Sequence, residues 1–151
     1  MSAPALAYFA YGSNMDRAAM SARCPAATPL GVARLSGFRF RVNAAGWATI
    51  LLAAPERQVW GLLWRLTPAD EAALDVYEGV GEGLYTRLAV APRLLPDDRG
   101  IAAFAYAATD PRPGRPAPAY RAAILAAAAA LELPAAYQLE LAAALSGGGP
   151  A

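Results

Sequence analysis

The chain of 151 residues contains no histidine and no lysine, and it has a single cysteine, Cys24. The absence of histidine excludes Ser-His-Asp and Cys-His catalysis and most zinc sites. The absence of lysine excludes Schiff-base chemistry and the lysine of a phosphate-binding loop. If the chain is an enzyme, we therefore expect its general acid or base to be Asp, Glu or Tyr.

Strong charge and long apolar runs are also missing. The net charge is +1, so we expect no nucleic-acid partner and no attraction to an acidic membrane surface. The longest uncharged apolar run, 122–131, is too short to cross a bilayer, and the start of the chain lacks the pattern of a secretory signal. One cysteine permits no intrachain disulfide, which fits a reducing compartment. We expect a cytoplasmic protein without a membrane partner.

The pattern of the remaining residues predicts one α+β domain over 1–151, because the length suffices for one core and no linker or repeat divides it. Strand-like stretches outnumber helical ones, which predicts a mixed, mostly antiparallel sheet that can curl toward a barrel, with flanking helices. Strands are expected at 8–11, 31–42 (bent or divided at Gly37), 47–53, 59–66, 84–94 and 101–107. Helices are expected at 16–23, 67–78, 119–132 and 134–145. The tail 146–151 is expected to fray.

The stretch 8–15, Tyr-Phe-Ala-Tyr-Gly-Ser-Asn-Met, predicts a buried strand that ends at Gly12 and turns directly into a helix. Ser13 or Asn14 would cap this helix, and Gly12 would let a ligand approach the backbone. The N–H groups and the partial positive charge of a helix start suit a carboxylate or a developing oxyanion. A plain strand–turn–helix with a capping side chain explains the same pattern without a ligand.

Glu78 differs from the other acidic residues, which suit helix starts, turns or solvated helix faces. It falls in the last turn of its expected helix, where the macrodipole disfavours a negative charge, and on the same face as Leu74. Aromatic, apolar and small neighbours would desolvate it and raise its pKa, as a general base near neutral pH requires. A surface glutamate before the C-cap Gly79 is the alternative without a function.

Three other side-chain types have both a structural and a functional interpretation. Tyr120 shares a helical stripe with Ile124 and Leu131, so it is either a core tyrosine or a hydroxyl donor facing a cavity. Ser13 has no histidine or lysine to activate it, so capping or substrate contact is its expected role. The tryptophans at 47, 60 and 64 are expected in the core rather than on a ligand platform.

The stretch 8–15, combined with Glu-Gly-Val-Gly-Glu-Gly-Leu-Tyr at 78–85, resembles the gamma-glutamylcyclotransferase family. Further agreement, in order along the chain, comes from Gly31-Val-Ala-Arg-Leu, Ala48-Thr-Ile, Val59-Trp-Gly-Leu-Leu-Trp, Leu74-Asp75, Tyr120, Leu133-Pro134 and Tyr137. The resemblance covers about residues 8–145. The Tyr-Gly-Ser-Asn form is more similar to the enzymes acting on gamma-glutamyl amino acids than to the glutathione-specific or gamma-glutamylamine branches.

The resemblance implies a small mixed β-barrel with flanking helices and a reaction that needs no metal or organic cofactor. The substrate, a small gamma-glutamyl amino acid, would be converted to 5-oxoproline and a free amino acid by attack of its α-amine on its γ-carbonyl, with Glu78 as general acid/base. The resemblance leaves a homodimer open. The residues that it implies in substrate binding are Tyr8, Phe9, Ala10, Tyr11, Gly12, Ser13, Asn14, Tyr85 and Tyr120.

Two alternatives to this function stay open from the sequence. The first is a non-catalytic module that binds and senses a small carboxylate, although a buried negative charge at Glu78 gives an anion binder no advantage. The second is a cyclotransferase acting on another gamma-glutamyl amide. The leaving group is set by pocket walls that the sequence does not place, with 43–47 and 110–118 as candidates.

Overall fold

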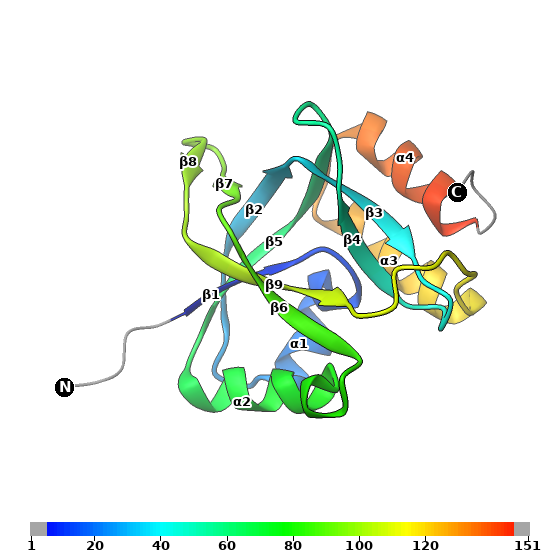
Figure 1. The fold of residues 1–151 in the computed structure, drawn as a ribbon. Helices are drawn as coiled ribbons and strands as arrows, with labels where there is room; N and C mark the ends of the chain where they lie inside the picture. Colours follow the sequence, from blue (N-terminus) through cyan, green and yellow to red (C-terminus); the bar gives the residue numbers. More distant parts are fainter. Residues whose placement is uncertain (1–5, 147–151) are drawn as a thin grey trace.

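The computed structural model describes residues 6–146, which form a curled seven-stranded sheet, a two-stranded hairpin and four α-helices (Figure 1). The strands are β1 (Leu6–Ala10), β2 (Thr28–Ser36), β3 (Phe38–Val42), β4 (Ala48–Leu52), β5 (Gln58–Leu66), β6 (Tyr85–Val90), β7 (Arg93–Leu94), β8 (Arg99–Gly100) and β9 (Ala103–Ala108). The helices are α1 (Arg17–Arg23), α2 (Pro68–Tyr77), α3 (Pro118–Ala130) and α4 (Ala135–Leu145), with 3-10 turns η1 (Ser13–Met15) and η2 (Val80–Glu82).

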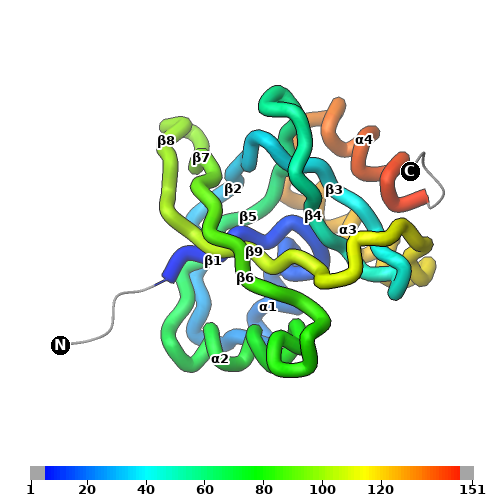
Figure 2. Tube along the Cα trace, in the orientation of Figure 1, coloured from blue at the N-terminus to red at the C-terminus, as the bar shows by residue number. Residues whose placement is uncertain are grey.

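The sheet has the strand order β6-β9-β1-β5-β2-β7-β8, and β3 pairs with β4 separately. The pair β1–β9 is parallel, whereas the other strand pairs described are antiparallel. The β3–β4 hairpin contacts the sheet at β9, where the Ala108 N–H donates to Thr49 Oγ1 at 2.9 Å. The sheet and the hairpin together curve around a common interior (Figure 2). The predicted α+β class, with a mostly antiparallel, curled sheet and flanking helices, is confirmed.

The predicted break at Gly37 is confirmed. Gly37, at φ +82°, divides β2 from β3. Thr67 and Asp70 form a capping box at the start of α2. The predicted single strand over 84–94 is wrong, because it splits into β6 and β7. Pro92 lies in the gap, where it has no N–H to donate to a ladder. The part of the predicted frayed tail from residue 147 onward lies outside the described residues.

Each face of the sheet buries its own apolar layer. Alternation along β1 sends Phe9 into the layer that contains Ile124 of α3 and Leu141 of α4. The same alternation sends Tyr8 into the other layer, which contains Leu74 of α2. Strand β1 thus runs between two helical layers, with α1 and α2 on one side and α3 and α4 on the other (Figure 1). No helix among residues 6–146 is long and apolar enough to cross a membrane.

Gly61 fixes the end of β1, where the candidate site begins. A Cβ atom at this position would lie 2.1 Å from the Ala10 carbonyl oxygen, so only glycine fits. Glycine inside a strand often marks such a close approach of another backbone segment. The approach lets β5 support β1 up to its last residue, from which the chain leaves the sheet through Tyr11 and Gly12.

Candidate active site

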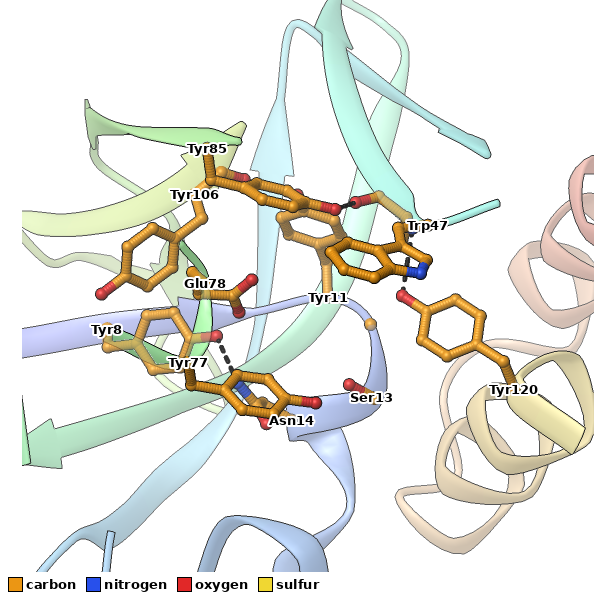
Figure 3. A pocket seen from close by; sticks show the side chains of 12 residues that line it. Tyr8, Tyr11, Ser13, Asn14, Trp47, Tyr77, Glu78, Tyr85, Tyr106 and Tyr120 are labelled. Carbon is orange, nitrogen blue, oxygen red and sulfur yellow. Dashed lines mark hydrogen bonds between the residues drawn. The ribbon is translucent and has the colours of Figure 1, made fainter. Parts of the chain in front are cut away.

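A pocket with a volume of about 280 Å³ opens at the carboxyl end of β1 (Figure 3). It is dominated by aromatic rings, and Glu78 is the charged side chain in its lining. The lining residues are Tyr8, Tyr11, Gly12, Ser13, Asn14, Trp47, Ala48, Tyr77, Glu78, Tyr85, Tyr106 and Tyr120.

The loop after β1 forms a short 3-10 turn, η1, and not the start of a long helix. The predicted cap is wrong, because neither Ser13 nor Asn14 caps α1; the Asp16 carboxylate accepts from the Ala18 N–H at 2.9 Å and caps it. A three-residue turn has almost no macrodipole. Within residues 6–146, however, the backbone N–H groups of Ser13 and Asn14 donate to no protein acceptor. Anion binding at this loop therefore depends on these individual N–H groups.

Asn14 holds this loop in place from its buried position, 3 % exposed. Its side-chain amide donates to Tyr8 Oη at 3.0 Å, and its side-chain oxygen accepts from Arg23. Its backbone carbonyl accepts from the indole N–H of Trp64 at 3.0 Å. Because all three partners come from different elements, the loop geometry is set by tertiary contacts. These contacts make Asn14 a structural hub as well as a lining residue.

Glu78 is the C-cap residue of α2, and its N–H donates to the Leu74 carbonyl at 2.8 Å. Gly79 follows at φ +66° and turns the chain away, as predicted. Figure 3 shows the Glu78 carboxylate pointing into the pocket, with tyrosine rings above and below it. Burial raises the pKa of Glu78 to about 7, and the positive charge of Arg23 opposes part of this shift. The carboxyl group therefore changes protonation state near neutral pH.

An ion-pair network fastens α2, and with it Glu78, to the sheet. Arg87 of β6 forms ion pairs with Asp75 at 2.7 Å and with Glu71 at 2.6 Å. The Tyr106 hydroxyl donates to Asp75 Oδ1 at 2.7 Å. The two carboxylates come from successive turns of α2, so this network fixes the rotation of the helix and the direction in which its last turn points.

Two pocket tyrosines hold the backbone of Ala48 from opposite sides. The Tyr85 hydroxyl donates to the Ala48 carbonyl at 2.6 Å, and the Ala48 N–H donates to Tyr120 Oη at 3.0 Å. The Tyr120 hydroxyl thus accepts a bond here and keeps its own proton for a ligand. Burial raises the pKa of Tyr120 to about 12 and shifts that of Tyr85 well above its usual value. Both hydroxyl groups are neutral donors at pH 7.

The structure brings most of the predicted site residues to the pocket, but it does not bring Phe9 or Ala10. Side chains alternate along β1, so the Phe9 ring packs in the opposite layer, and the Ala10 methyl is buried beside Leu62. The assignment of these two side chains to the substrate site is therefore corrected. The predicted residues that do line the pocket are Tyr8, Tyr11, Gly12, Ser13, Asn14, Glu78, Tyr85 and Tyr120.

Three lining residues were not among those predicted: Ala48, Tyr77 and Tyr106. Trp47 also lines the pocket, and it belongs to 43–47, one of the two segments named as candidate pocket walls. The core placement expected for Trp47 is wrong, because its side chain is 45 % exposed and stacks on the Tyr85 ring at 6.4 Å between centroids. Tyr77 precedes Glu78 directly, a position that could have suggested its place at the site. Residues 6–146 contain no cluster of three or more acidic or cysteine side chains that could hold a metal ion.

Comparison with known proteins shows which family the chain resembles. The model of the AIG2-like family matches residues 58–141. The chain is 31% identical over 144 residues to gamma-glutamylcyclotransferase of Bos taurus and 32% identical to that of Mus musculus. Each of these two matches covers 89% of this chain and 76% of the relative. A solved structure of a gamma-glutamyl cyclotransferase superposes with a TM-score of 0.86 at 29% identity, covering 97% of this chain and 91% of the other.

Proposed function

The chain belongs to the AIG2-like family, among its gamma-glutamylcyclotransferases, and we propose that its pocket cyclises a gamma-glutamyl amino acid to 5-oxoproline. The observation that carries this proposal is the Glu78 carboxyl, which lies partly buried at the end of α2 and points into the pocket, with a pKa of about 7. Every other titratable side chain in the lining is a tyrosine. Such a site has one group that can both accept and return a proton at neutral pH.

In the proposed reaction, Glu78 acts first as a base and then as an acid. Its carboxylate takes a proton from the substrate's α-ammonium group, and the free amine nitrogen attacks the γ-carbonyl carbon. The new C–N bond closes a five-membered ring and leaves a tetrahedral intermediate with a negatively charged oxygen. After the attack the ring nitrogen still carries two protons, and it must lose one of them to become the N–H of 5-oxoproline. As the bond to the leaving nitrogen breaks, the Glu78 carboxyl delivers its proton to that nitrogen and then takes up the proton that the ring nitrogen loses. This second proton ends on the departed amine, which leaves as an ammonium group, and Glu78 is again a carboxylate. Atoms and charge balance without a co-reactant.

The free N–H groups of Ser13 and Asn14 are suited to the anionic parts of this substrate. They can donate to the α-carboxylate or to the oxyanion of the intermediate, and donors already held in place need no reorganisation. Asn14 is held by three separate partners, as described above, which supports this role. A pocket that holds amine and carbonyl side by side can contribute about 7–11 kcal/mol through proximity alone.

The experiment that tests this function is the release of 5-oxoproline from a panel of gamma-glutamyl dipeptides, glutathione and a gamma-glutamyl amine. We expect release from the dipeptides with wild-type protein and almost none with Glu78→Gln. Wild-type protein that is folded and releases no 5-oxoproline from any compound would overturn the proposal. If thermal shift then showed stabilisation by the same compounds, the chain would be a binding module instead. We also propose a cytoplasmic location, which the single cysteine supports.

A further inference from the structure

The pocket lining divides into a buried floor and an exposed rim. Five side chains of the floor are at most 6 % exposed: Tyr8, Tyr11, Asn14, Tyr85 and Tyr106. The rim consists of Trp47 and Tyr77, which are 45 % and 47 % exposed. Burying a large aromatic side chain stabilises the fold, and a side chain that stays in contact with water does not contribute this free energy. Both are therefore placed where a ligand can cover them.

The turn that carries Trp47 is held rigidly at the mouth. The side-chain oxygen of buried Asn43 accepts from the N–H groups of Ala45 and Trp47, both at 3.1 Å. The Asn43 amide donates to the Asp110 carbonyl at 3.1 Å, so the turn is tied to the segment after β9. A Cβ atom at Gly46 would lie 2.8 Å from the Arg115 carbonyl oxygen, which shows how closely the two segments pack.

The indole ring of Trp47 is positioned by an aromatic neighbour. One face stacks on Tyr85 with an interplanar angle of 14°, and the next residue, Ala48, is fixed by the hydroxyl groups of Tyr85 and Tyr120. The exposed remainder of the indole thus lies in one defined place beside the pocket (Figure 3). A preorganised aromatic surface of this kind binds an apolar group without a further entropy cost of ordering its own side chain.

The chemistry of the proposed reaction determines where the leaving group extends. In the proposed reaction the α-amine, the γ-carbonyl and the leaving nitrogen must all lie within reach of Glu78, and either the α-carboxylate or the oxyanion lies against the loop at Ser13. The glutamyl part thus fills the floor. The rest of the leaving amino acid then has to pass out through the mouth, between Trp47 and Tyr77. Apart from Glu78, the lining carries no charged side chain, so a charged leaving group gains no ion pair from it.

On the basis of the proposed function, we infer that Trp47 is a specificity-determining residue that packs against the side chain of the leaving amino acid. The favoured substrates are gamma-glutamyl amino acids whose leaving residue has a bulky apolar or aromatic side chain. Glycine as the leaving residue has no side chain to reach the indole, and a charged side chain would lose hydration against it.

The test compares kcat/KM for gamma-glutamyl-phenylalanine, gamma-glutamyl-leucine and gamma-glutamyl-glycine. In wild type, we expect the first two to exceed the third by about tenfold, the scale of one apolar group in a pocket. Trp47→Ala should lower this ratio to about twofold or less, because it lowers kcat/KM for the phenylalanine and leucine substrates more than for gamma-glutamyl-glycine. Trp47→Phe, which retains a ring and is less disruptive to the turn, should give an intermediate ratio. The matched control is Leu52→Ala at the far end of β4, the strand that begins directly after Trp47, because Leu52 is 83 % exposed and outside the lining.

The outcomes separate this inference from the function on which it rests. If Trp47→Ala and Trp47→Phe lower all three rates equally, Trp47 has only a structural role and the inference is wrong, although the reaction stands. If wild type releases 5-oxoproline without a preference for bulky leaving residues, the inference is equally wrong. If wild type releases none from any dipeptide, the proposed function itself fails and the inference falls with it.

Discussion

The floor and the rim of the pocket are built by different means. Floor side chains are buried and bonded to partners on other elements, as Asn14 is to Tyr8, Arg23 and Trp64. The rim aromatics are half exposed and make few polar contacts with their side chains. Arg23 joins the two, because its guanidinium group also lies 4.0 Å from the centre of the Tyr77 ring. The difference indicates that changes in the floor alter chemistry, whereas changes in the rim alter the choice of substrate.

The largest effect on activity is expected from removing the negative charge of the Glu78 carboxyl at the floor of the pocket. Glu78→Gln should lower kcat by about 10²–10⁴-fold, the usual contribution of a general acid/base, because an amide cannot accept the ammonium proton. The measurement is 5-oxoproline release at saturating dipeptide. The control is Glu82→Gln, an exposed carboxylate in the nearby turn η2, which should keep wild-type turnover. Retention of turnover by a folded Glu78→Gln variant would exclude Glu78 as the general base.

The pH profile of the wild type distinguishes a buried carboxyl from a surface one. Burial raises the pKa of Glu78 from 4.5 to about 7, and the base must be ionised to act. The acidic limb of kcat/KM should therefore rise about tenfold per pH unit and level off above about pH 7. Glu82→Gln should leave its midpoint unchanged. A midpoint near pH 4.5 would mean that the carboxylate acts in a solvated state or that another group controls the rate.

The raised pKa of Glu78 also predicts that its carboxyl lowers the free energy of unfolding at neutral and alkaline pH. The folded state binds the Glu78 proton more tightly than the unfolded state, so stability is fully present below about pH 4.5 and falls as the pH rises through about 7. Glu78→Gln removes this loss and should raise the free energy of unfolding at pH 8 by about 1–3 kcal/mol. The measurement is urea unfolding at pH 8 and pH 4.

At pH 4, Glu78 is protonated in both states, and the difference between Glu78→Gln and wild type should be close to zero. An equal gain at both pH values would attribute the effect to packing of the amide rather than to the buried charge. If Glu78→Gln is less active and more stable than wild type at pH 8, Glu78 serves function at a cost in stability.

The smallest effect is expected at the rim. Tyr77→Ala should raise KM by about two- to fivefold with kcat nearly unchanged, because it removes contact area at the mouth without touching the proton path. Steady-state kinetics on one apolar dipeptide measures it. The control is Val76→Ala, the preceding residue, which is 81 % exposed and outside the lining. A tenfold or larger fall in kcat would show that the division between floor and rim does not hold at Tyr77.

The floor could be predicted from the sequence to the extent that its residues lie in local patterns. Gly12 at the end of a strand and Glu78 before Gly79 both belong to junctions whose residue types have a direct backbone explanation. The error at Phe9 has a physical reason as well. The stretch 8–15 was treated as one block of site residues, whereas a strand turns successive side chains to opposite faces, so that Tyr8 faces the pocket and Phe9 does not.

The amino-acid sequence alone limits which chemistry is possible at the site. It contains no histidine or lysine, and it has a carboxyl group at the end of a helix and a glycine loop after a central strand. The tertiary structure decided which side chains share the pocket. Tyr106 arrives there through the pairing of β9 with β6. Trp47 arrives there because the Asn43 turn that carries it is tied to the Asp110 carbonyl, 67 residues further along the chain. The pKa of Glu78 was decided in the same way, because desolvation depends on neighbours that only folding brings together.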